Sequence, residues 1–184
     1  FQVFVNPDYT NVNLGGRYIP LGTMTWDASG FGGTVYGSGV LLSSHQGVVI
    51  EPGSGARIYG ITIANEYQTG YGGAGSWEVQ VPDRGDIEFN YFHIIACSPN
   101  SDGISTQSSN NIRIYNSYFR TWDDGVVLKN YSGGNTHDIT VKTAYSGPIW
   151  RSPWRSARKP TRAAAQTRFT MPFSRTSTSS TAAI

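Results

Sequence analysis

Two related sequences, Ser101-Asp102-Gly103-Ile104 and Trp122-Asp123-Asp124-Gly125-Val126, lie within residues 100–130 and decide the fold of this chain. Each places an acidic residue and a glycine before a short apolar run, so one structural position is used twice. Asp102 and Asp124 are 22 residues apart, a spacing typical of one coil of a solenoid. We therefore expect the two sequences to lie on neighbouring coils.

Short strands of the form apolar-x-apolar extend this repeat on both sides. Alignment of Val35, Ile58, Phe89, Ile114 and Val141 gives steps of 23, 31, 25 and 27 residues. Self-similarity at this period, with Gly, Asn and Ser between the strands, is typical of a β-solenoid or a propeller-like array. No pattern of helical length separates the strands. We predict an all-β chain, folded as a right-handed parallel β-helix (a single-stranded solenoid) that is incomplete at its C-terminus.

Composition agrees with a turn-rich β protein, since the chain has 22 glycines, 11 tyrosines and only 14% charged residues. It has no apolar run of the length that a membrane span needs. The single cysteine, Cys97, excludes an internal disulfide framework, and we expect it to be a small buried apolar residue. The chain starts without Met or a charged leader, so a signal peptide is either absent or removed. We expect a secreted, extracellular monomer with neither a membrane nor a nucleic acid as partner.

Charge divides the chain sharply. Residues 1–141 hold 6 basic and 12 acidic residues, whereas residues 142–184 hold 8 basic and no acidic residues. We predict an N-terminal segment over residues 1–33 that leads into the solenoid, β-helix coils over 34–141, and a basic, unpacked tail over 142–184. When the codons of the tail are read starting from their third base, the genetic code permits two further sequences that have the pattern of solenoid coils. We therefore interpret the tail as the product of a frameshift near Val141. The chain is then a fragment of its intact parent, and the encoding nucleotide sequence tests this.

The aspartates carry the chemistry that we expect. Equivalent residues of successive coils stack about 4.8 Å apart, so Asp102, Asp123 and Asp124 would form a cluster of three carboxylates. Like charges at this range push at least one pKa upward, and carboxylates with different pKa values can perform acid/base hydrolysis of a glycosidic bond. Two alternatives stay open. Each aspartate can cap a strand in an Asx-turn whose glycine has a positive φ, or the cluster can bind calcium.

These motifs resemble the polygalacturonase family of glycoside hydrolases and the related dextranase/isopullulanase family, over about residues 30–141. The residues that carry the resemblance are Asn100-Ser101-Asp102-Gly103, Asp123-Asp124 and, upstream, Val35-Tyr36-Gly37-Ser38-Gly39-Val40-Leu41. It implies a right-handed parallel β-helix and inverting hydrolysis of an α-linked polysaccharide. It also implies that Asp123 is the general acid, while Asp102 and Asp124 hold and activate the attacking water.

The resemblance is incomplete in two respects. Gly125 stands where a typical polygalacturonase has cysteine, and the Gly-His-Gly and Arg-x-Lys motifs of that family are absent. The substrate therefore need not be a uronate.

Two neighbours of the aspartates complete the predicted site. Trp122 is either a platform on which a sugar stacks or a core residue, and Lys129 either contacts the sugar or is solvated. We expect no metal and no cofactor. A calcium-dependent polysaccharide lyase and a non-catalytic carbohydrate-binding or adhesive β-helix are the alternative functions. Specificity is expected to lie in loops such as residues 68–75.

Overall fold

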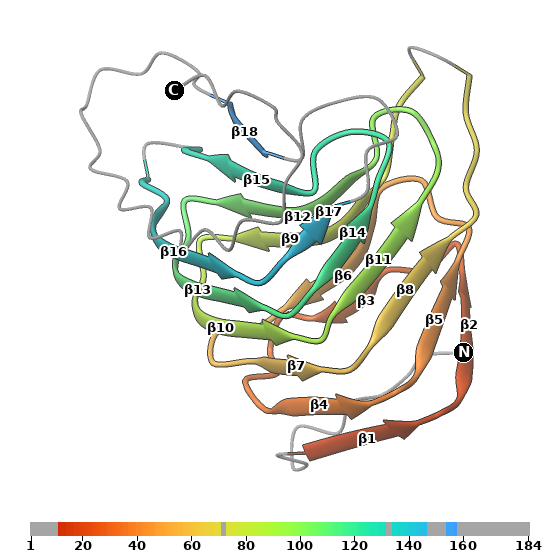
Figure 1. Cartoon of the computed structure of the whole chain (residues 1–184), viewed down its shortest axis with the longest axis horizontal. Coiled ribbons are helices and arrows are strands. Elements are labelled where there is room, and N and C mark those ends of the chain that lie inside the picture. Colours follow the sequence, from red (N-terminus) through yellow and green to blue (C-terminus); the bar gives the residue numbers. More distant parts are fainter. Residues whose placement is uncertain (1–10, 71–72, 132–133, 147–153, 158–184) are drawn as a thin grey trace.

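The computed structural model describes residues 11–70, 73–131, 134–146 and 154–157. Within these ranges the chain forms three parallel sheets of six strands each, and each coil contributes one strand to each sheet (Figure 1). The coils wind as a right-handed parallel β-helix, which confirms the predicted fold class. No helix in this described part is long and apolar enough to cross a membrane.

The strands of each sheet follow one another along the solenoid in chain order. Sheet A consists of β1 (Asn11–Gly15), β4 (Thr34–Gly37), β7 (Arg57–Tyr59), β10 (Gly85–Asn90), β13 (Asn110–Tyr115) and β16 (His137–Lys142). Sheet B consists of β2 (Tyr18–Gly22), β5 (Val40–Ser43), β8 (Thr62–Asn65), β11 (His93–Ala96), β14 (Tyr118–Arg120) and β17 (Tyr145–Ser146). Sheet C consists of β3 (Trp26–Ala28), β6 (Val48–Pro52), β9 (Trp77–Pro82), β12 (Asp102–Gln107), β15 (Val126–Lys129) and β18 (Trp154–Ala157).

The register of sheet A confirms the sequence alignment at every step. Val35 pairs with Ile58, Ile58 with Phe89, Phe89 with Ile114, and Ile114 with Val141. The unequal steps of the alignment therefore come from loops of different length between coils, not from shifts in strand pairing.

The core is a set of apolar columns inside the solenoid. Side chains alternate between the two faces of a strand, and the inward ones stack on their equivalents in the next coil. The column of sheet B, for example, contains Leu41, Ile63, Ile94 and Phe119, each at most 1% exposed. Burial of each such side chain contributes about 1.5–3 kcal/mol. This stacking fixes the register, because a slip of one residue would turn every inward side chain outward.

Repeated left-handed residues form two of the corners. Asp86, Asn111 and Asp138 occupy equivalent positions at the start of sheet A strands, with φ angles of 59°, 51° and 55°. Asn and Asp tolerate this conformation better than other residues with a Cβ. The corner between sheets A and B also has a left-handed residue in three successive coils, namely Tyr91, Asn116 and Thr143.

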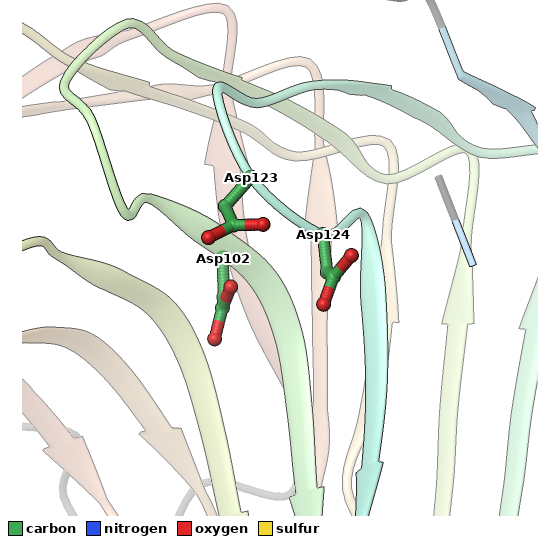
Figure 2. Close-up of side chains that lie close together, drawn as sticks. All are labelled: Asp102, Asp123 and Asp124. Atoms are coloured by element: carbon green, nitrogen blue, oxygen red, sulfur yellow. The ribbon is translucent and has the colours of Figure 1, made fainter. Parts of the chain in front are cut away.

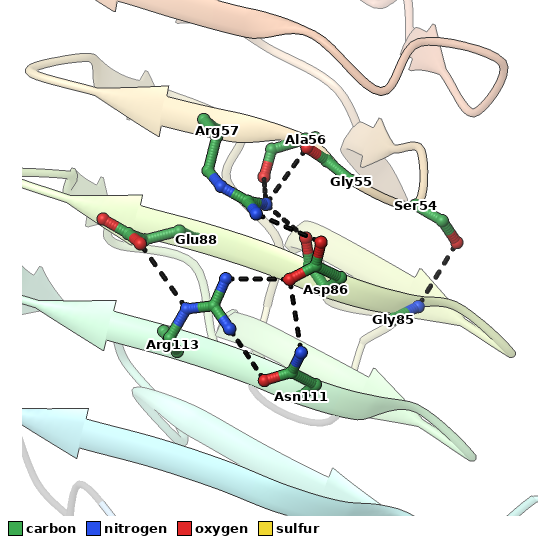
Figure 3. A network of polar contacts seen from close by, with 9 residues as sticks. All are labelled: Ser54, Gly55, Ala56, Arg57, Gly85, Asp86, Glu88, Asn111 and Arg113. Atoms are coloured by element: carbon green, nitrogen blue, oxygen red, sulfur yellow. Dashed lines mark hydrogen bonds and ion pairs between the residues drawn. The ribbon is translucent and has the colours of Figure 1, made fainter.

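A ladder of charges crosses the outer face of sheet A (Figure 3). Asp86 lies between two arginines of the neighbouring coils, with Arg57 Nη2 3.1 Å from Oδ2 and Arg113 Nη2 2.8 Å from Oδ1. Arg113 also pairs with Glu88 at 3.5 Å. The two guanidinium groups lower the pKa of Asp86. The ladder offsets the charge of acidic residues on this face, away from the aspartates of the predicted site.

The coils extend beyond the segment boundaries drawn from the sequence. Strands β1, β2 and β3 lie within residues 1–33 and pair with the next coil, Val12 opposite Val35. At the other end, the boundary after Val141 falls inside β16, and β17 and β18 pair with β14 and β15. The first ten residues and most of the tail lie outside the described residues.

Candidate active site

The corner between sheets B and C brings the two aspartate motifs together. Strand β12 begins at Asp102, and its Ile104 pairs with Val126 of β15, an offset of 22 residues that also places Asp124 beside Asp102. Backbone hydrogen bonds continue this pairing into the turn, because the Asp123 N–H donates to Ser101 O at 3.1 Å and the Gly103 N–H donates to Asp124 O at 2.8 Å. The predicted stacking of the two motifs is thus confirmed.

Carboxylate oxygens of Asp102, Asp123 and Asp124 lie within 4.8 Å of one another. Figure 2 shows Asp102 on one segment and the other two side chains on the segment beside it, with all three carboxylates gathered at the same corner. Asp102 is 9% exposed and Asp124 7% exposed, whereas Asp123 is half-buried. Asp123 is therefore the member of the cluster that a ligand can reach most easily.

Burial and the neighbouring charges together set the pKa of Asp102. Its burial raises the pKa of the carboxyl group, and the negative charge of Asp123 raises it further. Lys129 opposes both effects, since its Nζ lies 3.4 Å from Asp102 Oδ2. The site therefore contains a carboxyl group that holds its proton more strongly than usual, next to a cation that favours the charged form.

Gly103 has a different role from the one that an Asx-turn would require. It lies in β12 and does not have a positive φ. A Cβ at this position would lie 2.2 Å from the backbone oxygen of Gly125 and 3.3 Å from Cδ1 of Phe119. Glycine is needed here because the two coils approach closely, so the interpretation of this Asp-Gly pair as a turn with a left-handed glycine is wrong.

A fourth carboxyl group, that of Glu78, lies on the coil that precedes the coil of Asp102. It was not identified from the sequence as part of the site. It is completely buried in β9, where Trp77 pairs with Asp102. Ser76 Oγ donates a hydrogen bond to Glu78 Oε1 at 2.6 Å, and Asn65 Nδ2 donates to Oε2 at 3.1 Å. Burial raises the pKa of Glu78 to about 7 despite these two donors, and the charge of Asp102 adds to the rise.

The loop between β8 and β9 packs against the turn that precedes Asp102. Asn100 Nδ2 donates to Gly73 O at 2.8 Å, and Ser76 Oγ lies 3.3 Å from Ser101 Oγ. The loop predicted to influence specificity therefore contacts the segment that carries the first aspartate.

The two other predicted site residues lie beside the aspartates. Trp122 is half-buried in the turn next to Asp123, so it is neither a core residue nor a freely exposed one. Lys129 is partly buried and contacts Asp102, so the interpretation of its ammonium group as simply solvated is wrong.

Cys97 also differs from the expectation, because its side chain is exposed. Ile94, Ala96 and Ser98 around it are buried, and this alternation turns Cys97 to the outer face. It lines a groove of about 550 Å³ beside sheet B, together with Leu42, Glu66 and Ile95. None of the three aspartates lines this groove, so the candidate site rests on the carboxylates and not on this cavity.

The same three carboxylates are close enough to ligate one divalent cation through oxygen atoms. Lys129 already places a positive charge of the chain itself against Asp102. We therefore interpret the cluster first as an acid/base site and keep calcium as the alternative.

Comparisons with known proteins returned no matching family model, no similar curated protein and no similar solved structure. The resemblance to polygalacturonases and dextranases stays a prediction based on the quoted motifs.

Proposed function

We propose that this β-helix is a glycoside hydrolase that cleaves an α-linked polysaccharide by acid/base catalysis. The observation that carries the proposal is the gathering of three aspartate carboxylates within 4.8 Å at one corner of adjacent coils. Ionised carboxylates at that distance repel one another, so such a cluster favours retention of a proton by one member. A retained proton beside charged carboxylates is the arrangement that glycosidic bond cleavage requires.

The exposures of the aspartates suit different roles. Asp123 is half-buried and can reach the leaving oxygen of a bound sugar, so it serves as the general acid. Asp102 and Asp124 are buried. Burial raises the pKa of Asp102, and Lys129 at 3.4 Å opposes that rise and favours its charged form. These two carboxylates hold and activate the attacking water. Trp122 and Lys129 lie beside them and bind the substrate in this proposal.

The stereochemistry of the product tests the proposed division of roles. Two catalytic carboxyl groups about 5 Å apart are typical of retaining enzymes, and a wider gap of roughly 6.5–9.5 Å is typical of inverting ones. The resemblance implies inversion, and a third carboxylate gives the water a second acceptor. We expect an α-linked substrate to release the β-anomer first, as followed by proton NMR. Early release of the α-anomer would contradict the assignment of Asp102 and Asp124 to water.

Substitution of the general acid is the direct test of the function. The full chain is assayed on a panel of α-linked polysaccharides, with new reducing ends as the readout. Asp123→Asn should lower the rate by about 100-fold or more, because general acid catalysis contributes at least that much. Asp83→Asn is the matched control, since Asp83 is exposed in a turn and its left-handed φ of 47° suits asparagine. Equal rates for the two variants would refute the catalytic role.

A polysaccharide lyase is the second candidate, favoured by the contact between Lys129 and a carboxylate cluster that could bind calcium. A lyase would use a basic residue to abstract a proton and would leave an unsaturated sugar. Ultraviolet absorbance that rises with the reaction and disappears with a chelator would identify it. Binding to the polysaccharide without cleavage in either assay would identify a carbohydrate-binding or adhesive β-helix.

The proposal also places the protein outside the cell, as a monomer whose partner is its polysaccharide substrate and which needs no cofactor. A chelator should therefore leave the hydrolysis rate unchanged.

A further inference from the structure

Glu78 is held in place by side chains from its own coil, and one of these is anchored to the backbone of the coil below. Its Oε1 accepts a hydrogen bond from Ser76 Oγ at 2.6 Å, and both carboxylate oxygens lie within 3.2 Å of Asn65 Nδ2. Asn65 Nδ2 also donates to His45 O at 3.1 Å. Asn65 Oδ1 accepts from the Tyr67 N–H at 3.0 Å. A completely buried carboxyl group with these contacts is fixed in position.

The same network reaches the turn that presents Asp102. Ser76 Oγ contacts Ser101 Oγ at 3.3 Å, and Ser76 O accepts a hydrogen bond from the Asp102 N–H at 3.0 Å. Ser101 Oγ in turn donates to Ser98 O. Ser76 therefore joins Glu78 to both the side chain and the backbone of the segment that begins β12.

We propose that Glu78 is a positioning residue of this site: it fixes the turn that presents Asp102 and, by keeping its own proton, leaves Asp102 as the charged carboxylate of the pair. The catalytic consequence rests on the proposed hydrolase function, whereas the coupling of the two carboxyl groups can be measured without a substrate.

The surroundings of Glu78 explain why the two carboxyl groups do not ionise together. Asp102 is the charged group that faces Glu78 from β12, and Asn65 and Ser76 are neutral. On the β6 side, Glu78 lies opposite the apolar Val49. Burial raises the pKa of Glu78 to about 7, and the charge of Asp102 adds to this rise. Lys129 lies 3.4 Å from Asp102 and favours its charged form, whereas no cation contacts Glu78 among the described residues. We therefore expect Asp102 to lose its proton first. Ionisation of Glu78 above this pH adds a second buried negative charge, which weakens the retention of charge on Asp102.

Carbon-13 NMR of the side-chain carboxyl groups tests this coupling in the full chain, in the presence of a chelator. We expect the carboxyl carbon of Glu78 to titrate near pH 7. The carboxyl carbon of Asp102 should show a second, smaller inflection at the same pH. Glu78→Gln, which keeps the size and polarity of the side chain, should remove this second inflection. Glu51→Gln is the control, because it removes a carboxylate from neighbouring strand β6 of the same sheet.

The outcomes separate the inference from the proposed function. Titration of Glu78 at an ordinary pH, or of Asp102 in one step in the wild-type protein, would overturn the inference even if Glu78→Gln fails to fold. In an active protein, the pH–rate profile should change slope near pH 7 in the wild type and not in Glu78→Gln, with little difference between the two at lower pH. Coupled titration without any hydrolysis supports the coupling and refutes the hydrolase.

Discussion

Removal of the Glu78 carboxyl group should change how the stability of the fold depends on pH. The pKa of Glu78 rises from its ordinary value of 4.5 to about 7 in the folded chain, because the group is completely buried. Each pKa unit corresponds to about 1.4 kcal/mol, so the shift amounts to about 3 kcal/mol. Since the folded state binds the proton more tightly, the stabilisation is complete below pH 4.5 and is lost as the pH rises to about 7.

Urea denaturation of the full chain at about pH 5 and about pH 8 measures this effect. The wild-type free energy of unfolding should be about 3 kcal/mol lower at the higher pH from this group alone. Glu78→Gln should reduce the difference by that amount, and the Glu51→Gln control should not. Asp86 does not interfere, because its pKa is lowered from 3.8 and its contribution is lost only below that pH. The same pH dependence in wild type and Glu78→Gln would refute the reasoning.

Three further substitutions, and Gly30→Ala as a control, test what holds the coils together. Gly103→Ala should destabilise the chain by about 1–3 kcal/mol in denaturant, because its Cβ meets the backbone of the next coil, whereas Gly30→Ala has free space and should be neutral. Ile94→Ala should cost about 2–5 kcal/mol by thermal or urea denaturation, since the side chain is completely buried. Asp86→Asn should cost about 0.5 kcal/mol at low salt and less at high salt, because its pairs with arginine are exposed. No loss for Ile94→Ala would contradict this account of the core, and a large loss for Asp86→Asn would contradict the low value given to the exposed ion pairs.

The strand register could be predicted because it depends on a local pattern. Each sheet A strand repeats an apolar residue on the inward face, and stacking of equivalent residues requires nothing else to align the coils. The first coil was missed although its signal is present, since Val12 precedes Val35 by the same 23 residues that separate Val35 from Ile58. Val12 belongs to a run of only four residues in which polar and apolar side chains alternate. This strand pattern is weak without knowledge of the next coil.

The aspartate cluster could also be predicted, because Asp102 and Asp124 repeat one position on adjacent coils. The packing that surrounds the cluster could not be predicted from the sequence. Gly103 is needed for close contact with Gly125 rather than for a turn, and this distinction depends on the separation of two coils. A sequence motif specifies which residues are equivalent but not how closely their backbones approach.

Glu78 and Cys97 show why burial was harder to predict than register. Strand alternation in β9 places Glu78 on the side opposite Val79, where an acidic residue is expected to meet water. It is buried because Asn65 and Ser76, from the preceding strand and loop, enclose it. Cys97 shows the opposite case. Its residue type predicts burial, but the alternation of side chains between the two faces of the chain places it on the exposed face. Alternation decides the face of a side chain, whereas its exposure depends on loops whose lengths differ from coil to coil. The proposed chemistry of this site therefore depends on the loop between β8 and β9 as much as on the aspartates themselves.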